Sequence, residues 1–317
     1  MTNPFAQYRT DGYVPANPQT PVATLQRNGQ PITLPPSVDL RPKCSPVEDQ
    51  GVLGSCSACA LVGALEYWQI AEGTGYTNLS RLFVYYNARR FMETEHQDSG
   101  ATMDQLMAAV VGFGVCEEDL WPYDQDRLTL RPSDEVYQRA IRIPDVQYAR
   151  VSPDDERKYL LASGYPILFS MSVPTVLFQE VAGKTGYMAK PQSGWEPAVG
   201  GGHTMLIVGY DDARRVWIVR NSYGTSFGER GYLYIDYDVM EYYAERVGYY
   251  SVGPLEKNQF FSLIGPTTES IISQTVLAAP PAVQSAVSKL RTHVRQDLES
   301  NLEQTRRGLR DRLRGGR

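Results

Sequence analysis

Cysteine, histidine and long apolar runs are scarce in this chain of 317 residues, and each scarcity excludes a class of protein. Four cysteines are too few for a disulfide-stapled secreted scaffold and are compatible with a reducing compartment. No apolar run is long enough for a transmembrane helix, and residues 1–21 lack the basic start and apolar core of a secretory signal. We therefore expect a protein that is cytoplasmic or exported by a non-classical route.

Apolar residues make up 42% of the chain, which is enough to bury a sizeable core in one large domain or two modest ones. The net charge of −5 is unevenly distributed along the sequence. Residues 281–317 hold nine Lys/Arg and four Asp/Glu, a net charge of +5, which leaves −10 on the remainder. This asymmetry predicts a C-terminal tail with a role of its own.

The pattern of apolar residues predicts an α+β body of two lobes. Residues 1–33 are rich in Pro, Asn, Gln and Thr and are expected to form an extended arm. Apolar spacings of three and four then predict helices in the first half of the body, at 55–73, 80–92 and 102–114. After Asp145 the pattern changes to short runs of strand-forming residues, separated by Gly, Pro and Asp-Asp turns.

The C-terminal part is expected to comprise a linker, residues 255–280, and a basic amphipathic helix, residues 281–317. The apolar stripe of this helix is only one residue wide, which is typical of a coiled-coil seam, a docking helix or a surface-lying helix. The helix could thus dock on a partner protein, self-associate, or remain a solvated tail. Nucleic acid is an unlikely partner, because no base-reading motif is visible.

The stretch "DQGVLGSCSACALVGALEYW", residues 49–68, contains two cysteines three residues apart. A redox pair would need a thioredoxin-like strand before it, and a metal site would need two further ligands at workable spacing; the sequence offers neither, so no metal or cofactor is expected. Cys56 lies in the first turn of the predicted helix, where free N–H groups and the helix dipole favour a thiolate. Cys56 is therefore the candidate nucleophile, and Cys59 is expected to be a small core residue.

A nucleophilic cysteine needs a base, and the chain has three histidines. His96 lies in a charged loop and His293 in the basic tail, whereas His203 opens a predicted strand after a glycine-rich stretch. A histidine at such a position can face a cleft, although a core or capping role is equally compatible with the sequence.

Two further side chains fit the same chemistry. Asn221 follows a predicted strand eighteen residues after His203, and its amide oxygen could fix the imidazole tautomer; the alternative is a turn asparagine. Gln50 precedes Cys56 by six residues, and its NH₂ group could join the Cys56 backbone N–H in stabilising an oxyanion.

Taken together, "DQGVLGSCSA", "GGHTMLIVGY" and "NSYGTSFGERGYLYI" resemble the papain-like (cathepsin-type) cysteine peptidases, with "LPPSVDLRP" similar to the family's mature N-terminus. Cys56 precedes His203 by 147 residues and Asn221 by 165, against family separations of about 130–150. The resemblance implies a papain-like two-lobe peptidase domain over residues 34–254. It also implies a cysteine endopeptidase that acts on protein or peptide substrates without a cofactor.

By this resemblance Cys56 is the nucleophile, His203 the acid and base, Asn221 its orienting group and Gln50 the oxyanion donor. Two alternatives use the same fold. One is an acyl transferase with the same residues and a different acceptor, and the other is a catalytically silent binding or scaffolding module.

The resemblance also suggests substrate contacts at Ser99 and Gly100, in a segment that lies beside the cleft in the family, and a pocket widened by Gly202. Two positions depart from the family pattern: Ser57 and Tyr223 stand where most members carry Trp. The stretches "LGSCSA" and "LSRLFVYYNAR" are similar to bacterial and viral branches of the family.

The arm ahead of the peptidase-like domain is too short to form the helical propeptide of lysosomal relatives. Within residues 8–25, "YRTDGYVPANPQTPVATL", the composition favours an extended, proline-stiffened segment. We expect this segment either to lie along the active site as a plug or to be a disordered leader.

Overall fold

The computed structural model describes residues 3–15, 21–29, 33–141, 143, 146–152, 156–191, 194–195, 202–244, 248–290 and 292. Of the predicted tail helix, residues 281–290 are described and helical, and His293 and the residues after it lie outside the described part. Within them, no helix has the length and apolarity that crossing a membrane requires.

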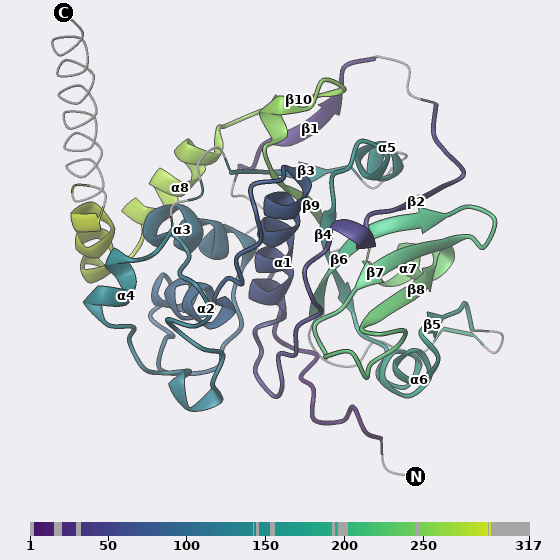
Figure 1. The fold of residues 1–317 in the computed structure, drawn as a ribbon, viewed down its shortest axis with the longest axis horizontal. Coiled ribbons are helices and arrows are strands. Elements are labelled where there is room, and N and C mark those ends of the chain that lie inside the picture. The colour runs from purple at the N-terminus through teal and green to yellow at the C-terminus, as the bar shows by residue number, and fades with distance from the viewer. Residues whose placement is uncertain are drawn as a thin grey trace, which may run out of the picture.

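Helices form one lobe of the molecule, as the sequence predicted (Figure 1). Its central helix is α1, which is buried on every side over its first twelve residues, so its apolar residues are not confined to one stripe. α3 begins at a capping box between Thr102 and Gln105 and ends at Gly114, whose φ of 78° stops the helix. The helices of this lobe are α1 (Cys56–Ala71), α2 (Arg81–Arg90), α3 (Met103–Phe113), α4 (Asp134–Gln138) and α8 (Thr268–Leu277).

A mostly antiparallel sheet forms the second lobe, with the strand order β10-β1-β3-β9-β4-β6-β7-β8-β5 and β2 paired to β6. α5 (Glu156–Ala162), α6 (Gly183–Thr185) and α7 (Tyr237–Ala244) accompany these strands. The strands are β1 (Thr24–Arg27), β2 (Ser37–Asp39), β3 (Gln147–Val151), β4 (Ile167–Ser172), β5 (Tyr187–Met188), β6 (Gly202–Asp211), β7 (Val216–Arg220), β8 (Tyr232–Asp236), β9 (Tyr249–Gly253) and β10 (Phe261–Ile264). The α+β class is thus confirmed.

Two segments that were expected to lack regular structure carry some. β1, within the expected arm, pairs with β10 and β3, and the expected linker of residues 255–280 contains β10 and α8. These elements are short and have no strong apolar periodicity of their own, so their pairing depends on partners distant in sequence.

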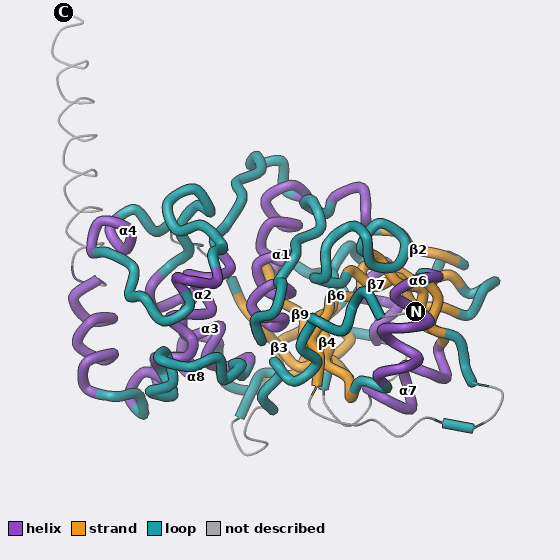
Figure 2. The backbone as a smooth tube through the Cα atoms, turned by 90° about the horizontal axis from the view of Figure 1, so that it is seen from below, coloured by secondary structure: helices purple, strands orange, loops and turns teal. Residues whose placement is uncertain are grey.

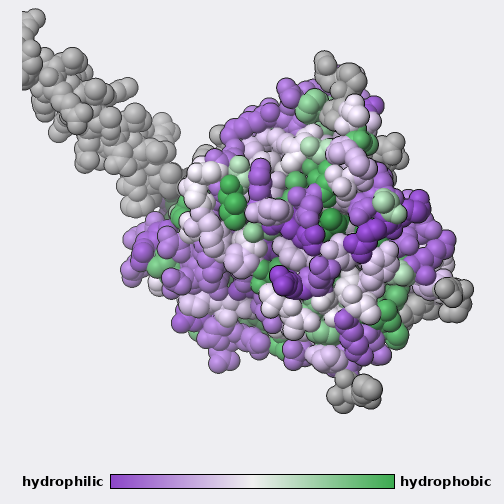
Figure 3. All heavy atoms as spheres, turned by 45° about the vertical axis from the view of Figure 1, so that its right-hand side comes forward, coloured by the Kyte–Doolittle hydropathy of each residue, from purple (hydrophilic) through white to green (hydrophobic). Residues whose placement is uncertain are grey.

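α1 and β6 lie at the junction of the lobes, where α1 packs directly on β6. One apolar core fills the helical side, and a second lies between the sheet and the elements on its other face. On the face drawn in Figure 3, hydrophilic side chains predominate and apolar ones occur in small patches. The start of α1 and the start of β6 therefore meet in a region that both lobes border.

Candidate active site

Cys56 is the first residue of α1 and is completely buried. Ser55 precedes it as the helix N-cap residue, and the Ser55 carbonyl accepts the first helical hydrogen bond, from the Cys59 N–H. Burial raises the pKa of the Cys56 thiol to about 12, although hydrogen bonds from the backbone of Thr204 and Ser57 act in the opposite direction. Cys59 is also buried, as expected of a core residue.

His203 is the second residue of β6, and Asn221 directly follows the neighbouring strand β7. The His203 Nε2 and Asn221 Oδ1 atoms are 2.7 Å apart. Because an amide oxygen only accepts, Nε2 carries the proton of the neutral ring and Nδ1 carries the lone pair. The Nδ1 atom is buried and has no hydrogen-bond partner among the residues that the structure describes.

The two halves of the site meet at Thr204, the residue after His203. Its backbone and side chain are near enough to the Cys56 thiol to lower the pKa of that thiol, which places the start of α1 beside β6. Burial lowers the pKa of His203 to about 4, while the hydrogen bond with Asn221 acts to raise it. Thiol and imidazole are therefore both neutral in this arrangement.

Aromatic rings cover the hydrogen bond between His203 and Asn221. The Tyr223 ring centroid is 4.8 Å from the imidazole and the Phe178 centroid is 5.6 Å from it. Tyr223 is completely buried, so this tyrosine excludes water from the pair.

Gln50 lies in the turn before α1 with its side chain completely buried. Its Nε2 donates to the Leu53 carbonyl at 2.8 Å, and its Oε1 accepts from the Ser222 hydroxyl at 2.6 Å. One of its two amide protons is thereby used within the turn, and the other is available to a group bound in front of Cys56.

Tyr123 is a residue of this site that sequence reasoning missed. Its hydroxyl donates to the Gln50 carbonyl at 2.9 Å and lies 2.5 Å from the Ser55 hydroxyl, so it ties both ends of the turn before Cys56. The Arg81 guanidinium lies 4.2 Å from its ring centroid. Since Tyr123 is 67 residues from Cys56 in sequence, no local spacing could have connected the two.

The N-terminal segment 3–15 crosses this site between the two lobes (Figure 1). The Tyr8 ring stacks on Tyr223 at 4.2 Å with 10° between the planes. The Tyr8 hydroxyl lies 3.0 Å from Asp49 and 3.1 Å from the Tyr223 carbonyl, and the Tyr223 hydroxyl donates to the Arg9 carbonyl at 2.9 Å. The segment therefore covers the aromatic lid over the histidine.

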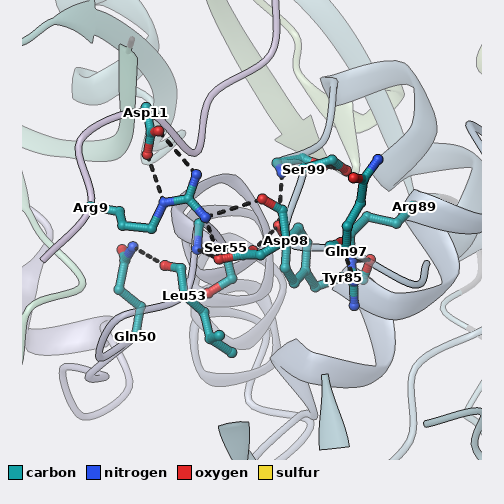
Figure 4. A network of polar contacts seen from close by, with 12 residues as sticks. Arg9, Asp11, Gln50, Leu53, Ser55, Tyr85, Arg89, Gln97, Asp98 and Ser99 are labelled. Atoms are coloured by element: carbon teal, nitrogen blue, oxygen red, sulfur yellow. Dashed lines mark hydrogen bonds and ion pairs between the residues drawn. The ribbon is translucent and has the colours of Figure 1, made fainter. Parts of the chain in front are cut away.

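An ion pair fixes the next part of the segment to the helical lobe (Figure 4). Arg9 lies 2.5 Å from Asp98 and also pairs with Asp11. Asp98 in turn accepts hydrogen bonds from the Gly54 N–H, at 2.9 Å, and from the Tyr85 hydroxyl, at 2.6 Å. The charged anchor is thus joined to the turn that precedes Cys56.

Gly12 and Tyr13 then lie directly against Gly100 and Gly202, respectively. A Cβ atom on Gly100 would lie 2.5 Å from the Gly12 carbonyl oxygen, so the backbones of these two segments are in contact. The Tyr13 N–H donates to the Gly202 carbonyl at 3.0 Å, and a Cβ on Gly202 would meet the Tyr13 ring at 2.9 Å. Ser99 instead hydrogen-bonds within its own loop, to the Thr94 hydroxyl at 2.8 Å.

A small cavity of about 10 Å³ remains beside Tyr13. Its floor contains the Ser170 and Thr204 hydroxyls, which are hydrogen-bonded to each other at 2.9 Å. The remaining wall is mostly apolar, and the cavity is lined by Tyr13, Ser57, Met103, Leu168, Phe169, Ser170, Thr204 and Tyr250. Among the described residues, no group of three or more His, Cys, Asp or Glu could hold a metal ion.

Comparison with known proteins gives consistent results. The profile of the papain family cysteine proteases matches residues 34–251. A peptidase C1-like protein of Acanthamoeba polyphaga mimivirus is 34% identical over 199 residues, which cover 60% of this chain and 63% of that protein. A cathepsin L-like peptidase of Aedes aegypti is 27% identical, with 64% and 59% covered, so the chain spans about three fifths of these curated relatives.

Solved structures agree with the sequence matches. The crystal structure of xylellain, a cysteine protease from Xylella fastidiosa, superposes with a TM-score of 0.69 at 31% identity and covers 77% of this chain and 97% of that one. The digestive procathepsin L 3 of Tenebrio molitor gives a TM-score of 0.59 at 20% identity, with 78% and 77% covered, and shares the fold.

Proposed function

The chain belongs to the papain family of cysteine proteases, and on that premise we propose that it is an endopeptidase whose nucleophile is Cys56. The observation that carries the proposal is the arrangement of His203. One ring nitrogen is held by Asn221, while the other is buried without a hydrogen-bond partner among the described residues, and the residue next in sequence, Thr204, lowers the pKa of the Cys56 thiol. This leaves the lone pair of Nδ1 as the acceptor for the thiol proton.

The reaction then follows in two halves. The Cys56 proton passes to His203 Nδ1, and the sulfur attacks the carbonyl carbon of the scissile peptide bond. Hydrogen bonds from the Cys56 backbone N–H and the free Gln50 amide proton stabilise the oxyanion. The C–N bond breaks as the imidazolium gives its proton to the leaving amine, and a water activated by His203 hydrolyses the thioester.

Substitution tests the assignment directly. Cys56→Ala should abolish cleavage of a fluorogenic peptide and leave the thermal unfolding midpoint close to that of the wild type. Asn221→Ala should retain a small residual activity, because it disorders the imidazole without removing it. Residual turnover by Cys56→Ala would contradict the mechanism.

We further propose that segment 3–15 keeps the enzyme latent. The support is the set of contacts that place Gly12 against Gly100 and Tyr13 against Gly202, the two glycines expected to contact substrate. Because β1 is paired on both edges, the cut that tests this should follow residue 15 and keep β1 intact. Equal peptidase activity with and without residues 1–15 would dismiss latency.

The same residues can pass the acyl group to an amine instead of water. Mass analysis of the products with and without an added amine separates hydrolysis from acyl transfer. We propose hydrolysis as the main reaction because water needs no second binding site.

A further inference from the structure

A second cavity lies in the helical lobe and has no part in the proposed peptidase chemistry. Its volume is about 520 Å³, within the range of small-molecule sites. α4 and the end of α2 form one side of it, and the helix of residues 281–290 forms the other. Figures 1 and 2 both place α4 and this last helix at the end of the molecule away from the sheet and from segment 3–15.

Three cationic side chains face this cavity, together with one carboxylate. Asp134 is engaged by Arg131 at 2.6 Å. Neither Arg90 nor Lys289 forms an ion pair with a carboxylate in the described part of the chain. The lining therefore carries a formal charge of +2, which matches the charge of a phosphate monoester near neutral pH.

Contacts with three neighbouring side chains hold the Arg90 guanidinium in place. Its Nη1 donates to the Tyr137 hydroxyl at 3.2 Å and to Asn87 Oδ1 at 3.3 Å. Its guanidinium also lies 5.1 Å from the Phe113 ring centroid. These contacts leave other N–H groups of the guanidinium for a ligand, in the planar geometry that suits phosphate oxygens.

The opposite wall supplies an apolar surface. Val283 and Val287 are buried and fix the helix of residues 281–290 to the body, with Val287 packed against Gly112 of α3. The same helix turns Ala282, Ala286 and Leu290 toward the cavity. A ligand that fills this space would thus place a charged end near Arg90 and Lys289 and an apolar group along the helix.

We propose that this cavity is a binding site for a small phosphate monoester with a flat or apolar organic group. The phosphate interacts with Arg90 and Lys289, and the organic group packs against Ala282, Ala286 and Leu290. The site is independent of Cys56 chemistry, because none of the residues that line it belongs to the candidate active site.

The test measures the binding of 1-naphthyl phosphate to the full chain by isothermal titration calorimetry. We expect saturable binding that weakens with added salt and with acidification below the second phosphate pKa of about 6. Neutral 1-naphthol should not bind, and inorganic phosphate should compete. Absence of binding by 1-naphthyl phosphate at millimolar concentration, or equal binding of 1-naphthol, would overturn the proposal.

Variants locate the binding. Arg90→Met keeps an unbranched apolar side chain and removes the guanidinium, and Lys289→Met removes an exposed charge; each should weaken binding roughly tenfold to a hundredfold. Lys184→Met, an exposed lysine of α6, is the matched control and should bind as the wild type does. If Arg90→Met fails to fold, the exposed Lys289→Met decides, and unchanged affinity in it would refute the site.

Discussion

Tyr8→Ala should convert the covered active site into an accessible one. Tyr8 is only 5% exposed, its ring stacks on Tyr223, and its hydroxyl contacts Asp49 and the Tyr223 carbonyl. The substitution removes all of these contacts and leaves the rest of segment 3–15 unchanged. The quantity that changes is the free-energy difference between the covered and the open state.

The magnitude follows from the three contacts. Burial of the ring contributes about 1.5–3 kcal/mol, the stacked geometry about 0.5–1.5 and the hydroxyl about 1 kcal/mol. Their sum, about 3–5.5 kcal/mol, corresponds to a rise of roughly 10²- to 10⁴-fold in the open population. Tyr8→Phe keeps the ring and loses only the hydroxyl, so we expect a rise of about fivefold.

The assay is the rate at which iodoacetamide alkylates Cys56, mapped by mass spectrometry. When the covered state dominates, this rate is proportional to the open population, so it should increase in the order wild type, Tyr8→Phe, Tyr8→Ala. A variant lacking residues 1–15 sets the upper limit, and thermal unfolding of each variant excludes general destabilisation. Equal rates in the wild type, Tyr8→Ala and the truncated variant would refute the reasoning.

Three further outcomes are expected. Burial raises the pKa of Glu66 to about 7, so its contribution to stability is present below pH 4.5 and is lost as pH rises through 7. Glu66→Gln should therefore be more stable than the wild type by about 3 kcal/mol at pH 8 and nearly equal to it at pH 4, measured by urea unfolding. Gly253→Ala should lower the free energy of unfolding by roughly 3 kcal/mol or more, because the added Cβ would lie 2.0 Å from Trp68 Nε1 at a φ of 143°. Thermal unfolding measures this loss. Gln50→Ala should lower kcat roughly 10²-fold with little change in KM, measured on protein lacking residues 1–15.

Sequence reasoning proposed candidate site residues at positions where one residue type serves one chemical need. Cys56 opens a helix whose apolar spacing is visible in the sequence, and His203 and Asn221 each flank a strand of apolar residues. Local pattern and chemical requirement point to the same positions in these cases. The helical and β-rich halves were predictable for the same reason.

Contacts between distant segments were not predictable in this way. Tyr123 reaches the turn before Cys56 only because the fold returns the chain there, and nothing in its neighbours indicates this. β1 is likewise a strand only because it pairs with β3 and β10, which are distant in sequence. Composition predicted an extended arm over residues 1–33, but the path of segment 3–15 depends on aromatic stacking and one ion pair.

If segment 3–15 keeps the enzyme latent as we propose, it affects the chemistry as well as access. With water excluded, burial raises the pKa of Cys56 and lowers that of His203, so proton transfer from sulfur to imidazole would create two charges in a dry site. When segment 3–15 leaves, water reaches both groups, the desolvation penalty falls, and the dipole of α1 can stabilise the thiolate. Opening should therefore increase the alkylation rate through accessibility and also shift its pH dependence toward lower pH. A rise in rate without such a shift would mean that the segment acts only as a steric barrier.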